Sequence, residues 1–281
     1  MTPIVSWIVP VASGEKWLDR CLKSIVNQTY NSWEALIIIN GQINSNEYSK
    51  IKIKYSKFKN KIFFYELKKR GLANALNFGL KKCKGEWIAR LDADDYCIKQ
   101  RLEIQMNYTS YDLIFSNVDY VDEKEKKLYS NKLLEKIYYN KKTFFEIIHS
   151  YFIKMLSKYP NKISVSDELS FRNPIPHSSV LIRKSILIKV GGYSSNQDGN
   201  NPCQDLKTWH LLKDINCKFY IVDKILTYIS IHPHQITASK EARYECAQIN
   251  YIHFKKNKDY RSLVASIYQL ILSLKTSKRY D

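Results

Sequence analysis

The sequence predicts an α/β fold with a mostly parallel, doubly wound central sheet flanked by helices. Two observations lead to this class. Short apolar runs alternate with amphipathic segments over the first hundred residues, and polar residues such as Asn40 and Asp92 directly follow two of the apolar runs. Strand–helix alternation is typical of parallel sheets, whose ligands bind at the carboxyl ends of the strands. We therefore expect a ligand site near Asn40 and Asp92.

Four strands are predicted in the first hundred residues, at 3–11, 35–39, 61–67 and 86–91. A helix is expected after the first strand, because apolar residues there recur at helical spacing: Leu18, Cys21, Leu22, Ile25 and Val26. Another helix is expected after the third strand, where the residues of one helical face are apolar: Leu72, Ala75, Leu76 and Leu80. This order of elements is that of the predicted α/β class.

The second half of the chain is less regular. Residues 112–122 predict a strand, whereas 123–172 are basic and aromatic and predict a largely helical insertion, which either shapes specificity or serves as plain packing. A strand and a helix are expected over 176–193 and a helix over 204–213, after which the apolar-rich segment 219–232 follows. We expect one domain over residues 1–238, followed by a helical tail over 239–281.

Composition limits the classes of function. Of the 281 residues 44% are apolar, which suffices for a substantial core, and 45 Lys and Arg against 27 Asp and Glu give a formal charge of +18. That excess indicates an anionic partner: phosphorylated ligands, nucleic acid or an anionic membrane surface. The six cysteines are scattered without a C-x-x-C pair, which argues against a zinc site and favours reduced thiols in a cytosolic protein.

No segment has the pattern of a targeting or membrane-spanning sequence. The N-terminus lacks a basic leader, and no run is long and apolar enough to cross a bilayer, so we expect a cytoplasmic protein. The segment 261–279 places apolar residues on one helical face between basic ends: Leu263, Ile267, Leu270, Ile271 and Leu274. Such a helix lies either on an anionic membrane surface, against the core or in an oligomer interface.

Three aspartates, Asp92, Asp94 and Asp95, stand within four positions at the end of a predicted strand. Carboxylates packed this closely raise one another's pKa unless a cation lies between them. Hard cations such as Mg²⁺ or Mn²⁺ bind carboxylate and phosphate oxygens together, so the pattern indicates a metal-assisted diphosphate site. The structural alternative is that Asp94 or Asp95 caps a helix expected near Lys99.

The motifs "NQTY" (27–30), "GEWIARLDADD" (85–95) and "HSSVLIRKS" (177–185) occur in this order. Together with their surroundings, over about residues 3–238, they resemble glycosyltransferase family 2. The resemblance implies the GT-A fold and an inverting enzyme that uses a nucleotide-diphospho-sugar. Within the family the chain is most similar to bacterial enzymes that build lipooligosaccharide, capsule or related surface glycans.

The resemblance assigns a nucleotide-sugar site to residues near strand ends: Pro10, Val11, Ala12, Ser13, Asn40, Arg70, Asp92, Ala93 and Asp94. Ala12 and Ser13 replace the usual tyrosine and asparagine of the family. Asn40 replaces an aspartate that reads uracil, so UDP is expected and another nucleotide stays open. From spacing alone Asn40 is a turn residue before a glycine. Arg70 would meet the base or the diphosphate, or is a surface arginine.

The resemblance also assigns metal, base and acceptor roles. Asp94 and His232 would hold the divalent metal, Mn²⁺ or Mg²⁺, although His234 stands close to His232. Asp205 would be the base that deprotonates the acceptor, or is an ordinary helix-start aspartate favoured by the helix dipole. Three residues are weaker candidates for the acceptor side: His177, Gln204 and Trp209. Gln204 replaces a glutamate of the family, and core packing is the alternative for Trp209.

Three functional hypotheses follow. The first is a metal-dependent inverting glycosyltransferase with a glycan or lipid-linked acceptor, peripheral on the cytoplasmic face of the inner membrane and possible as an oligomer. The second is a nucleic-acid-binding protein, motivated by the charge of +18. The third is a family member that binds a sugar nucleotide without catalysis, motivated by Asn40 and Gln204.

Overall fold

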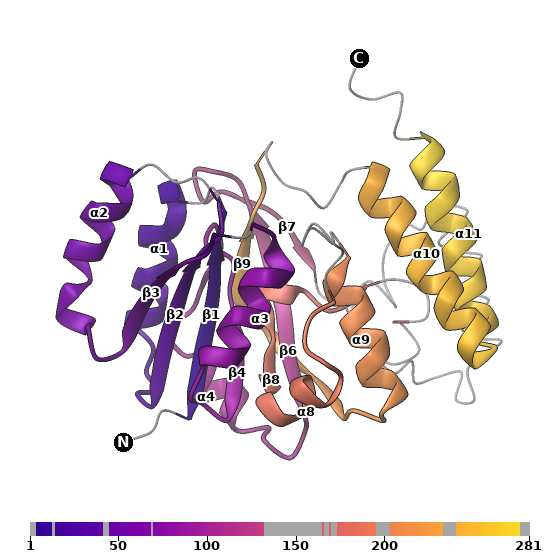
Figure 1. The fold of residues 1–281 in the computed structure, drawn as a ribbon, viewed down its shortest axis with the longest axis horizontal. Coiled ribbons are helices and arrows are strands. Elements are labelled where there is room, and N and C mark those ends of the chain that lie inside the picture. Colours follow the sequence, from indigo (N-terminus) through magenta and orange to yellow (C-terminus); the bar gives the residue numbers. More distant parts are fainter. Residues whose placement is uncertain are drawn as a thin grey trace. The chain divides into compact units, whose positions relative to one another are not determined.

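The computed structural model describes residues 4–12, 15–41, 45–68, 70–131, 165, 169, 173–194, 203–232 and 240–275. The chain divides into two compact units (Figure 1). The first consists of residues 1–131, 175–201 and 216–232, and the second of residues 132–174, 202–215 and 233–281. Each unit is therefore assembled from segments that are discontinuous in the sequence.

A nine-stranded sheet is the centre of the first unit, with strand order β3-β2-β1-β4-β8-β6-β9-β5 and with β7 paired to β6. Its strands are β1 (Val5–Val11), β2 (Trp33–Ile39), β3 (Ile62–Glu66), β4 (Trp87–Arg90), β5 (Tyr96–Cys97), β6 (Leu113–Val121), β7 (Lys127–Asn131), β8 (Leu181–Arg183) and β9 (Phe219–Ser230). The pairs β1–β2, β1–β4, β2–β3 and β6–β9 are parallel, whereas β8 lies antiparallel between β4 and β6. The predicted α/β class with a mostly parallel sheet is confirmed.

Helices cover both faces of the sheet, which explains why every residue of β1 and β2 is buried (Figure 1). On one face Trp7 packs in a cluster with Leu18 and Leu22 of α1. On the other face α3 approaches β1 so closely that a Cβ on Gly79 would lie 2.7 Å from the Ile8 side chain. The described helices of this unit are α1 (Glu15–Val26), α2 (Ser45–Lys54), α3 (Leu72–Lys82), α4 (Arg101–Met106) and α8 (Lys184–Lys189), with short 3₁₀ turns η1 (Ser56–Phe58) and η2 (His177–Ser179).

A buried arginine connects β4 with η2. Arg101, the first residue of α4, is fully buried, and its Nη1 donates a hydrogen bond to the Ser178 carbonyl at 2.7 Å. Its Nη2 donates to the carbonyls of Arg90 and Val180 at 3.0 and 3.1 Å. The guanidinium therefore fixes the end of β4, from which the aspartate segment follows, against the η2 turn.

The predicted helical insertion over 123–172 is wrong at its start. Residues 127–131 form β7, which pairs antiparallel with β6, and the rings of Tyr120 and Tyr129 stack across the pair at 4.5 Å. The turn between the strands is stabilised by Asp122, whose Oδ1 accepts the backbone N–H groups of Lys124 and Lys126 at 2.9 Å. A local hairpin thus overrides the helical composition. Apart from residues 165 and 169, the insertion from 132 to 172 lies outside the described residues.

The second unit contains α9 (Gln204–Asp214), α10 (Lys240–Asn257) and α11 (Tyr260–Lys275). The expectation of six reduced thiols is wrong for two of them, because Cys203 and Cys246 form a disulfide with their Cα atoms 6.0 Å apart. The partners are 43 residues apart in sequence, and the packing of α10 near the start of α9 brings them together. The other four cysteines are free and buried: Cys21, Cys83, Cys97 and Cys217.

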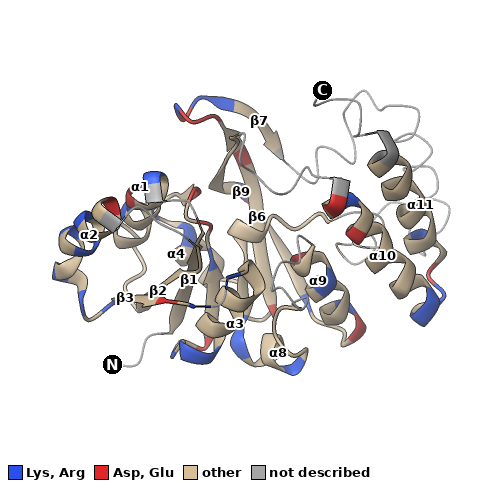
Figure 2. Ribbon diagram, turned by 45° about the horizontal axis from the view of Figure 1, so that its top comes forward, with Lys and Arg blue, Asp and Glu red and all other residues tan. Residues whose placement is uncertain are grey.

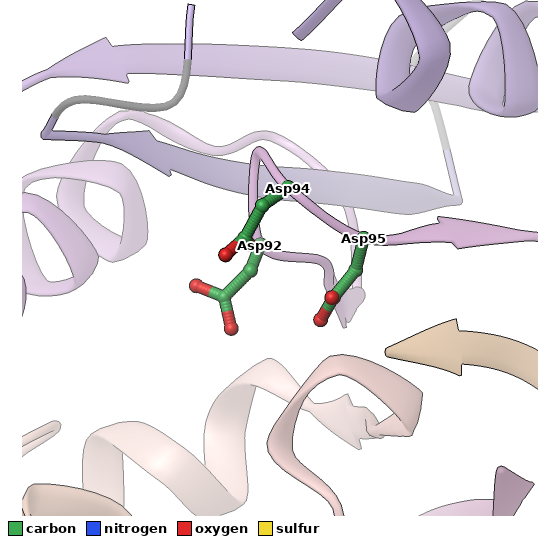
Figure 3. Close-up of side chains that lie close together, drawn as sticks. All are labelled: Asp92, Asp94 and Asp95. Atoms are coloured by element: carbon green, nitrogen blue, oxygen red, sulfur yellow. The ribbon is translucent and has the colours of Figure 1, made fainter. Parts of the chain in front are cut away.

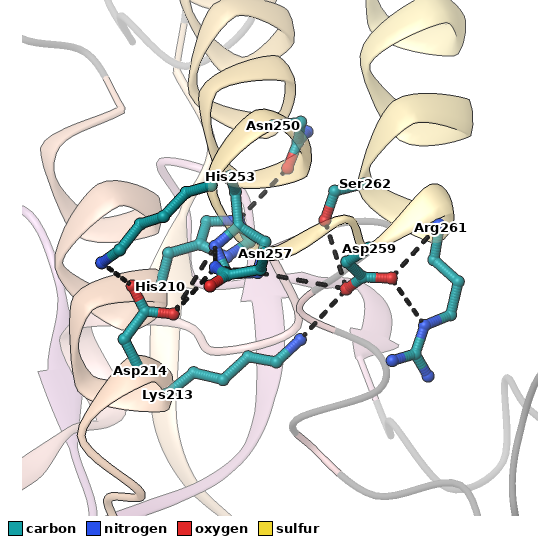
Figure 4. Close-up of polar contacts among 10 residues, drawn as sticks. His210, Lys213, Asp214, Asn250, His253, Asn257, Asp259, Arg261 and Ser262 are labelled. Atoms are coloured by element: carbon teal, nitrogen blue, oxygen red, sulfur yellow. Dashed lines mark hydrogen bonds and ion pairs between the residues drawn. The ribbon is translucent and has the colours of Figure 1, made fainter.

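A cluster of polar side chains joins α9 to the turn between α10 and α11 (Figure 4). His210 Nε2 lies 3.2 Å from Asn250 Oδ1, and the rings of His210 and His253 lie 4.2 Å apart. Burial lowers the pKa of His210 to about 3, with a smaller contribution from His253. His210 is therefore neutral in the folded protein at physiological pH.

Candidate active site

The aspartates Asp92, Asp94 and Asp95 lie in the loop that follows β4, at the carboxyl end of a strand near the middle of the sheet (Figure 3). One ligand atom from each of the three lies within 4.8 Å of the others. Among the described residues this is the one cluster of His, Cys, Asp or Glu with the spacing of a metal site. Its position fits the general rule that ligands of parallel sheets bind at carboxyl strand ends.

Asp92 is held in a fixed orientation. Its Oδ1 accepts a hydrogen bond from Nη2 of the buried Arg90 at 2.5 Å, and its Oδ2 accepts the Ser178 hydroxyl at 3.0 Å. The backbone N–H of Asp92 donates to the same Ser178 oxygen at 3.1 Å. The carboxylate nevertheless remains 37% exposed, so one side of it stays open to a ligand.

Asp95 is an internal anchor. It is buried, and its Oδ1 accepts the backbone N–H of Ser230, at the end of β9, at 2.9 Å. Burial and then the carboxylates of Asp94 and Asp92 raise the pKa of Asp95 well above its ordinary value. Helix α4 begins only at Arg101, with Gln100 as its N-cap and no side-chain cap, so neither Asp94 nor Asp95 has the capping role.

Asp94 contacts the histidine that ends the first unit. Asp94 Oδ2 lies 2.8 Å from His232 Nε2, and both side chains are largely buried. Burial and the neighbouring Asp92 raise the pKa of Asp94, while the hydrogen bond with His232 opposes this shift. The His232 ring stacks on Trp17 of α1, with centroids 4.5 Å apart and an interplanar angle of 20°.

Arg20, which the sequence interpretation missed, supports this loop from α1. Its Nη2 donates to the Asp94 carbonyl and to the Ser230 hydroxyl, both at 2.6 Å. The guanidinium also lies 4.5 Å from the centre of the Tyr96 ring. The sequence held one signal of this role. Arg20 stands on α1 between the buried Leu18 and Cys21, where a charged side chain needs polar partners. Arg20 and Trp17 together fix the backbone of Asp94 and the ring of His232.

The residues of this loop fit a divalent cation. Carboxylate oxygens are hard ligands, and an imidazole nitrogen lies within reach of the same position beside Asp94. Burial and the repulsion between neighbouring carboxylates raise the pKa values of Asp94 and Asp95. A bound cation would relieve this repulsion. Asp92 and Asp94 keep exposed edges, whereas Asp95 is turned inward onto β9.

The ends of β1 and β2 meet beside one another. The Asn40 N–H donates to the Val11 carbonyl at 3.0 Å, and a Cβ on Gly41 would lie 2.0 Å from the carbonyl oxygen of Ala12. Asn40 is buried, and its Oδ1 has no hydrogen-bond partner within the described part of the chain. Pro10, Val11 and Ala93 are buried and Ala12 is exposed, while Ser13 lies outside the described residues. The Asn40 Oδ1 is thus a buried acceptor that the described residues leave unsatisfied at the ends of these two strands.

The remaining candidates have different settings. Arg70 is exposed just before α3, and its carbonyl accepts a hydrogen bond from Asn74. His177 in η2 lies 3.4 Å from the Tyr193 hydroxyl, and burial together with the nearby Arg90 lowers its pKa well below the ordinary value. Both belong to the first unit.

Three candidates belong to the second unit, on α9. Asp205 lies in the first turn, where its Oδ1 accepts the Leu206 N–H at 2.7 Å and its Oδ2 accepts the Asn173 amide at 2.6 Å. Gln204 is buried, and its Oε1 has no partner among the described residues. Trp209 is completely buried, in keeping with the packing alternative.

Comparison with known proteins identifies the family. The glycosyl transferase family 2 model matches residues 6–169. The O-antigen biosynthesis glycosyltransferase WbnJ of Escherichia coli is 27% identical over 276 residues, which cover 96% of each chain. An uncharacterized glycosyltransferase of Rickettsia bellii (strain RML369-C) is 35% identical over 129 residues, 45% of this chain and 18% of that protein. The chain thus spans less than a fifth of the second relative's length.

Solved structures are similar in fold. Mannosyltransferase PcManGT from Pyrobaculum calidifontis, in complex with GDP-Man and Mn²⁺, superposes with a TM-score of 0.62 at 14% identity, covering 98% of this chain and 74% of that one. TarS 1-349 of S. aureus, in complex with UDP-GlcNAc, gives a TM-score of 0.60 at 15% identity, covering 99% and 73%. With the family model matching more than half of its length, the chain belongs to glycosyltransferase family 2 and has the GT-A fold.

Proposed function

We propose that this glycosyltransferase moves a sugar from a UDP-sugar to a hydroxyl of a bacterial surface glycan, by inverting single displacement and with a divalent metal. The observation that carries the proposal is the loop after β4, where Asp92 and Asp94 present open carboxylate edges beside His232. The name of the Escherichia coli relative supports an acceptor in O-antigen or related glycan synthesis. The UDP-GlcNAc complex of TarS supports a uridine donor.

The donor side is proposed to start at the ends of β1 and β2. Pro10 to Ser13 would line the base and ribose, and the free Oδ1 of Asn40 supports a role in accepting an N–H of the base. The imide N–H of uracil is such a donor. Asp92 would bind a ribose hydroxyl next to Ala93, and the exposed Arg70 would reach the base or the diphosphate.

Asp94 and His232 are the residues we propose to hold the metal, Mn²⁺ or Mg²⁺. The GDP-Man and Mn²⁺ complex of PcManGT supports a metal in this fold. When bound, the cation supplies a Lewis acid that stabilises the charge of the departing nucleoside diphosphate. Trp17 and Arg20 keep the two ligands in place through the ring stack on His232 and the hydrogen bond to the Asp94 carbonyl.

Asp205 is the proposed base. An inverting transferase needs one carboxylate that removes the proton of the acceptor hydroxyl while its oxygen attacks the anomeric carbon from the face opposite the diphosphate. The Asn173 amide and the Leu206 N–H both donate hydrogen bonds to the Asp205 carboxylate and so orient it. Gln204, His177 and Trp209 are proposed more weakly for the acceptor side.

We propose further that residues 1–238 act as the catalytic domain and 239–281 as an accessory tail, on the cytoplasmic face of the inner membrane. None of the helices in the described part of the chain has the length and apolarity needed to cross a bilayer. A peripheral position would suit an acceptor carried on lipid.

The test is release of nucleotide from a panel of UDP-, GDP- and other nucleotide-sugars, with Mn²⁺ or Mg²⁺ and then with chelator. We expect slow release of UDP from one donor, lost with chelator and in Asp94→Asn, and retained in the surface control Glu47→Gln. Calorimetric measurement of UDP binding distinguishes the enzyme from the non-catalytic alternative. In that alternative UDP binds in the presence of metal, but no donor is consumed even when an acceptor extract is added. Absence of any metal-dependent UDP binding would overturn the uridine-donor proposal.

A further inference from the structure

Helix α11 exposes several apolar residues. Among the side chains of α11 that the structure describes, those that are buried are small or polar, namely Ser262, Ala265 and Ser273. On this side Ser266 donates a hydrogen bond to the Ala247 carbonyl of α10 at 2.7 Å, so the two helices contact through small residues. A helix of a soluble protein normally turns its apolar stripe inward. Within the described part of the chain, the apolar stripe of α11 instead keeps several exposed side chains.

The exposed stripe consists of residues at helical spacing. Tyr260 is 64% exposed, Ile267 is 51% exposed and Leu270 is 42% exposed. The partly exposed Leu263 and Ile271 lie on the same face, because they are three or four residues from these positions. We call these five residues the outer face of α11. An exposed apolar strip of this kind usually marks a surface that contacts a partner.

The charge around the outer face is positive. Residues 240–275 contain seven Lys or Arg and three Asp or Glu, a net charge of +4, and α11 itself has no acidic residue. Three lysines and Arg261 stand at the turn between α10 and α11, where Figure 2 shows basic residues gathered. One of the three acids, Asp259, is already paired with Arg261 and Lys213. This arrangement complements an anionic surface.

Aromatic rings lie at the same end. The Phe254 ring stands between those of Tyr251 and Tyr260, at 6.3 and 5.4 Å, and Lys255 lies 4.9 Å from the Tyr251 ring. Tyrosines and lysines with an apolar stem and a polar tip are the residues that favour the headgroup region of a bilayer. An apolar strip with basic and tyrosine residues at its end has the composition of a helix that lies in a membrane interface.

We propose that the outer face of α11 docks on the surface of an anionic lipid bilayer. This deepens the localisation proposed above, for which it names the contact surface, and it concerns lipid binding rather than transfer. A second copy of the chain is the competing occupant. The lipid surface is favoured because two outer faces brought together would also bring two sets of basic residues together.

The experiment is flotation of the full chain with phosphatidylcholine vesicles, with and without phosphatidylglycerol. We expect binding only to the anionic vesicles, weakened by salt, and at least about tenfold weaker for the double variant Ile267→Glu and Leu270→Glu. The matched control is Ile53→Glu and Ile188→Glu, which alters two exposed isoleucines of the first unit and should bind like the wild type.

Two outcomes would overturn the proposal. One is unchanged vesicle binding by the α11 double variant. The other is a wild-type dimer, measured by light scattering, that becomes monomeric in this variant while neither protein floats with vesicles; that outcome would assign the outer face to a second copy. Nucleotide release from soluble donor is measured in parallel and should be equal in all three proteins. A loss of vesicle binding is thus distinguishable from a failure of the proposed reaction.

Discussion

Arg101 is a buried cation for which the described residues provide no carboxylate partner, and its replacement by leucine should strongly destabilise the first unit. The side chain is fully buried and makes four hydrogen bonds. Three go to the carbonyls of Ser178, Arg90 and Val180, and Nε donates to Gln105 Oε1 at 3.1 Å. The guanidinium also lies 4.9 Å from the centre of the Trp7 ring. Leucine can replace only the packing of the aliphatic stem.

The magnitude follows from the acceptors that would lose their donor. An unsatisfied buried acceptor costs about 1–3 kcal/mol, so four would cost roughly 4–12 kcal/mol if none found another donor. The Val180 carbonyl already accepts the Arg90 N–H, which lowers its share. Removing the charge also recovers several kcal/mol of desolvation, which is visible as the lowering of the Arg101 pKa by burial. We expect a net loss of about 3–5 kcal/mol.

The assay is urea unfolding with thermal unfolding beside it. A loss of this size corresponds to a fall in melting temperature of roughly 6–20 °C for a chain of this length class. Lys99→Leu is the matched control, since it removes an exposed positive charge two residues away and should change stability by less than about 0.5 kcal/mol. Arg101→Lys should fall between the two. A loss below about 1 kcal/mol in Arg101→Leu would refute the reasoning, because it would show that the carbonyls do not depend on the guanidinium.

Four further predictions follow from the site and the second unit. Asp205→Asn should abolish transfer to acceptor while UDP affinity, measured by calorimetry, stays within about twofold of wild type. Trp17→Leu should weaken Mn²⁺ binding, measured by electron paramagnetic resonance, about threefold or more, because the His232 ring loses its stacking partner. The pKa of His210 is about 3 in the folded protein and about 6.5 in the unfolded chain, so protonation of His210 favours the unfolded state. The free energy of unfolding should therefore decrease as the pH falls below 6.5, by about 2 kcal/mol between pH 7 and pH 5. Urea unfolding at the two pH values measures this loss, which should be smaller in His210→Gln. The Cys203–Cys246 disulfide closes a 43-residue loop, so its reduction should cost about 4 kcal/mol of stability. The wild-type protein should therefore have a lower melting temperature in dithiothreitol, and Cys203→Ser should have the lower melting temperature even without dithiothreitol.

The parts of the fold that the sequence predicted are those with a local signal. β1 and β2 are buried on both faces, so their sequences are nearly continuous apolar runs. β7 has no such run, since its residues "KLYSN" become a strand only by pairing with the edge of β6. The disulfide escaped prediction for a similar reason: nothing near Cys203 indicates that the chain will bring Cys246 beside it.

The candidate site divides in the same way. Asp92 and Asp94 carry a local pattern, and family resemblance pointed to His232, which the structure places 2.8 Å from Asp94. Arg20 and Trp17 carried no such pattern, and Ser178 lay in the quoted motif over 177–185 without a role assigned to it. Their contribution to the site depends on the direction in which a side chain of α1 or η2 points once the sheet has formed. That direction cannot be predicted from a single sequence. The supporting residues of a site are therefore harder to predict than the residues they support.

The bonds between the aspartate loop and the end of β9 have a consequence for biosynthesis. Asp95 binds the Ser230 N–H, 135 residues downstream, and the Arg20 guanidinium needs the Ser230 hydroxyl as one of its acceptors. β5 also forms only by pairing with β9. While the chain leaves the ribosome, β1 to β4 can associate early, but Asp95 lacks its partner on β9, and Arg20 lacks one of its acceptors, until Ser230 has been synthesised. The loop that we propose to bind the sugar nucleotide is thus incompletely supported until β9 has been synthesised, and its final geometry depends on a strand that emerges late.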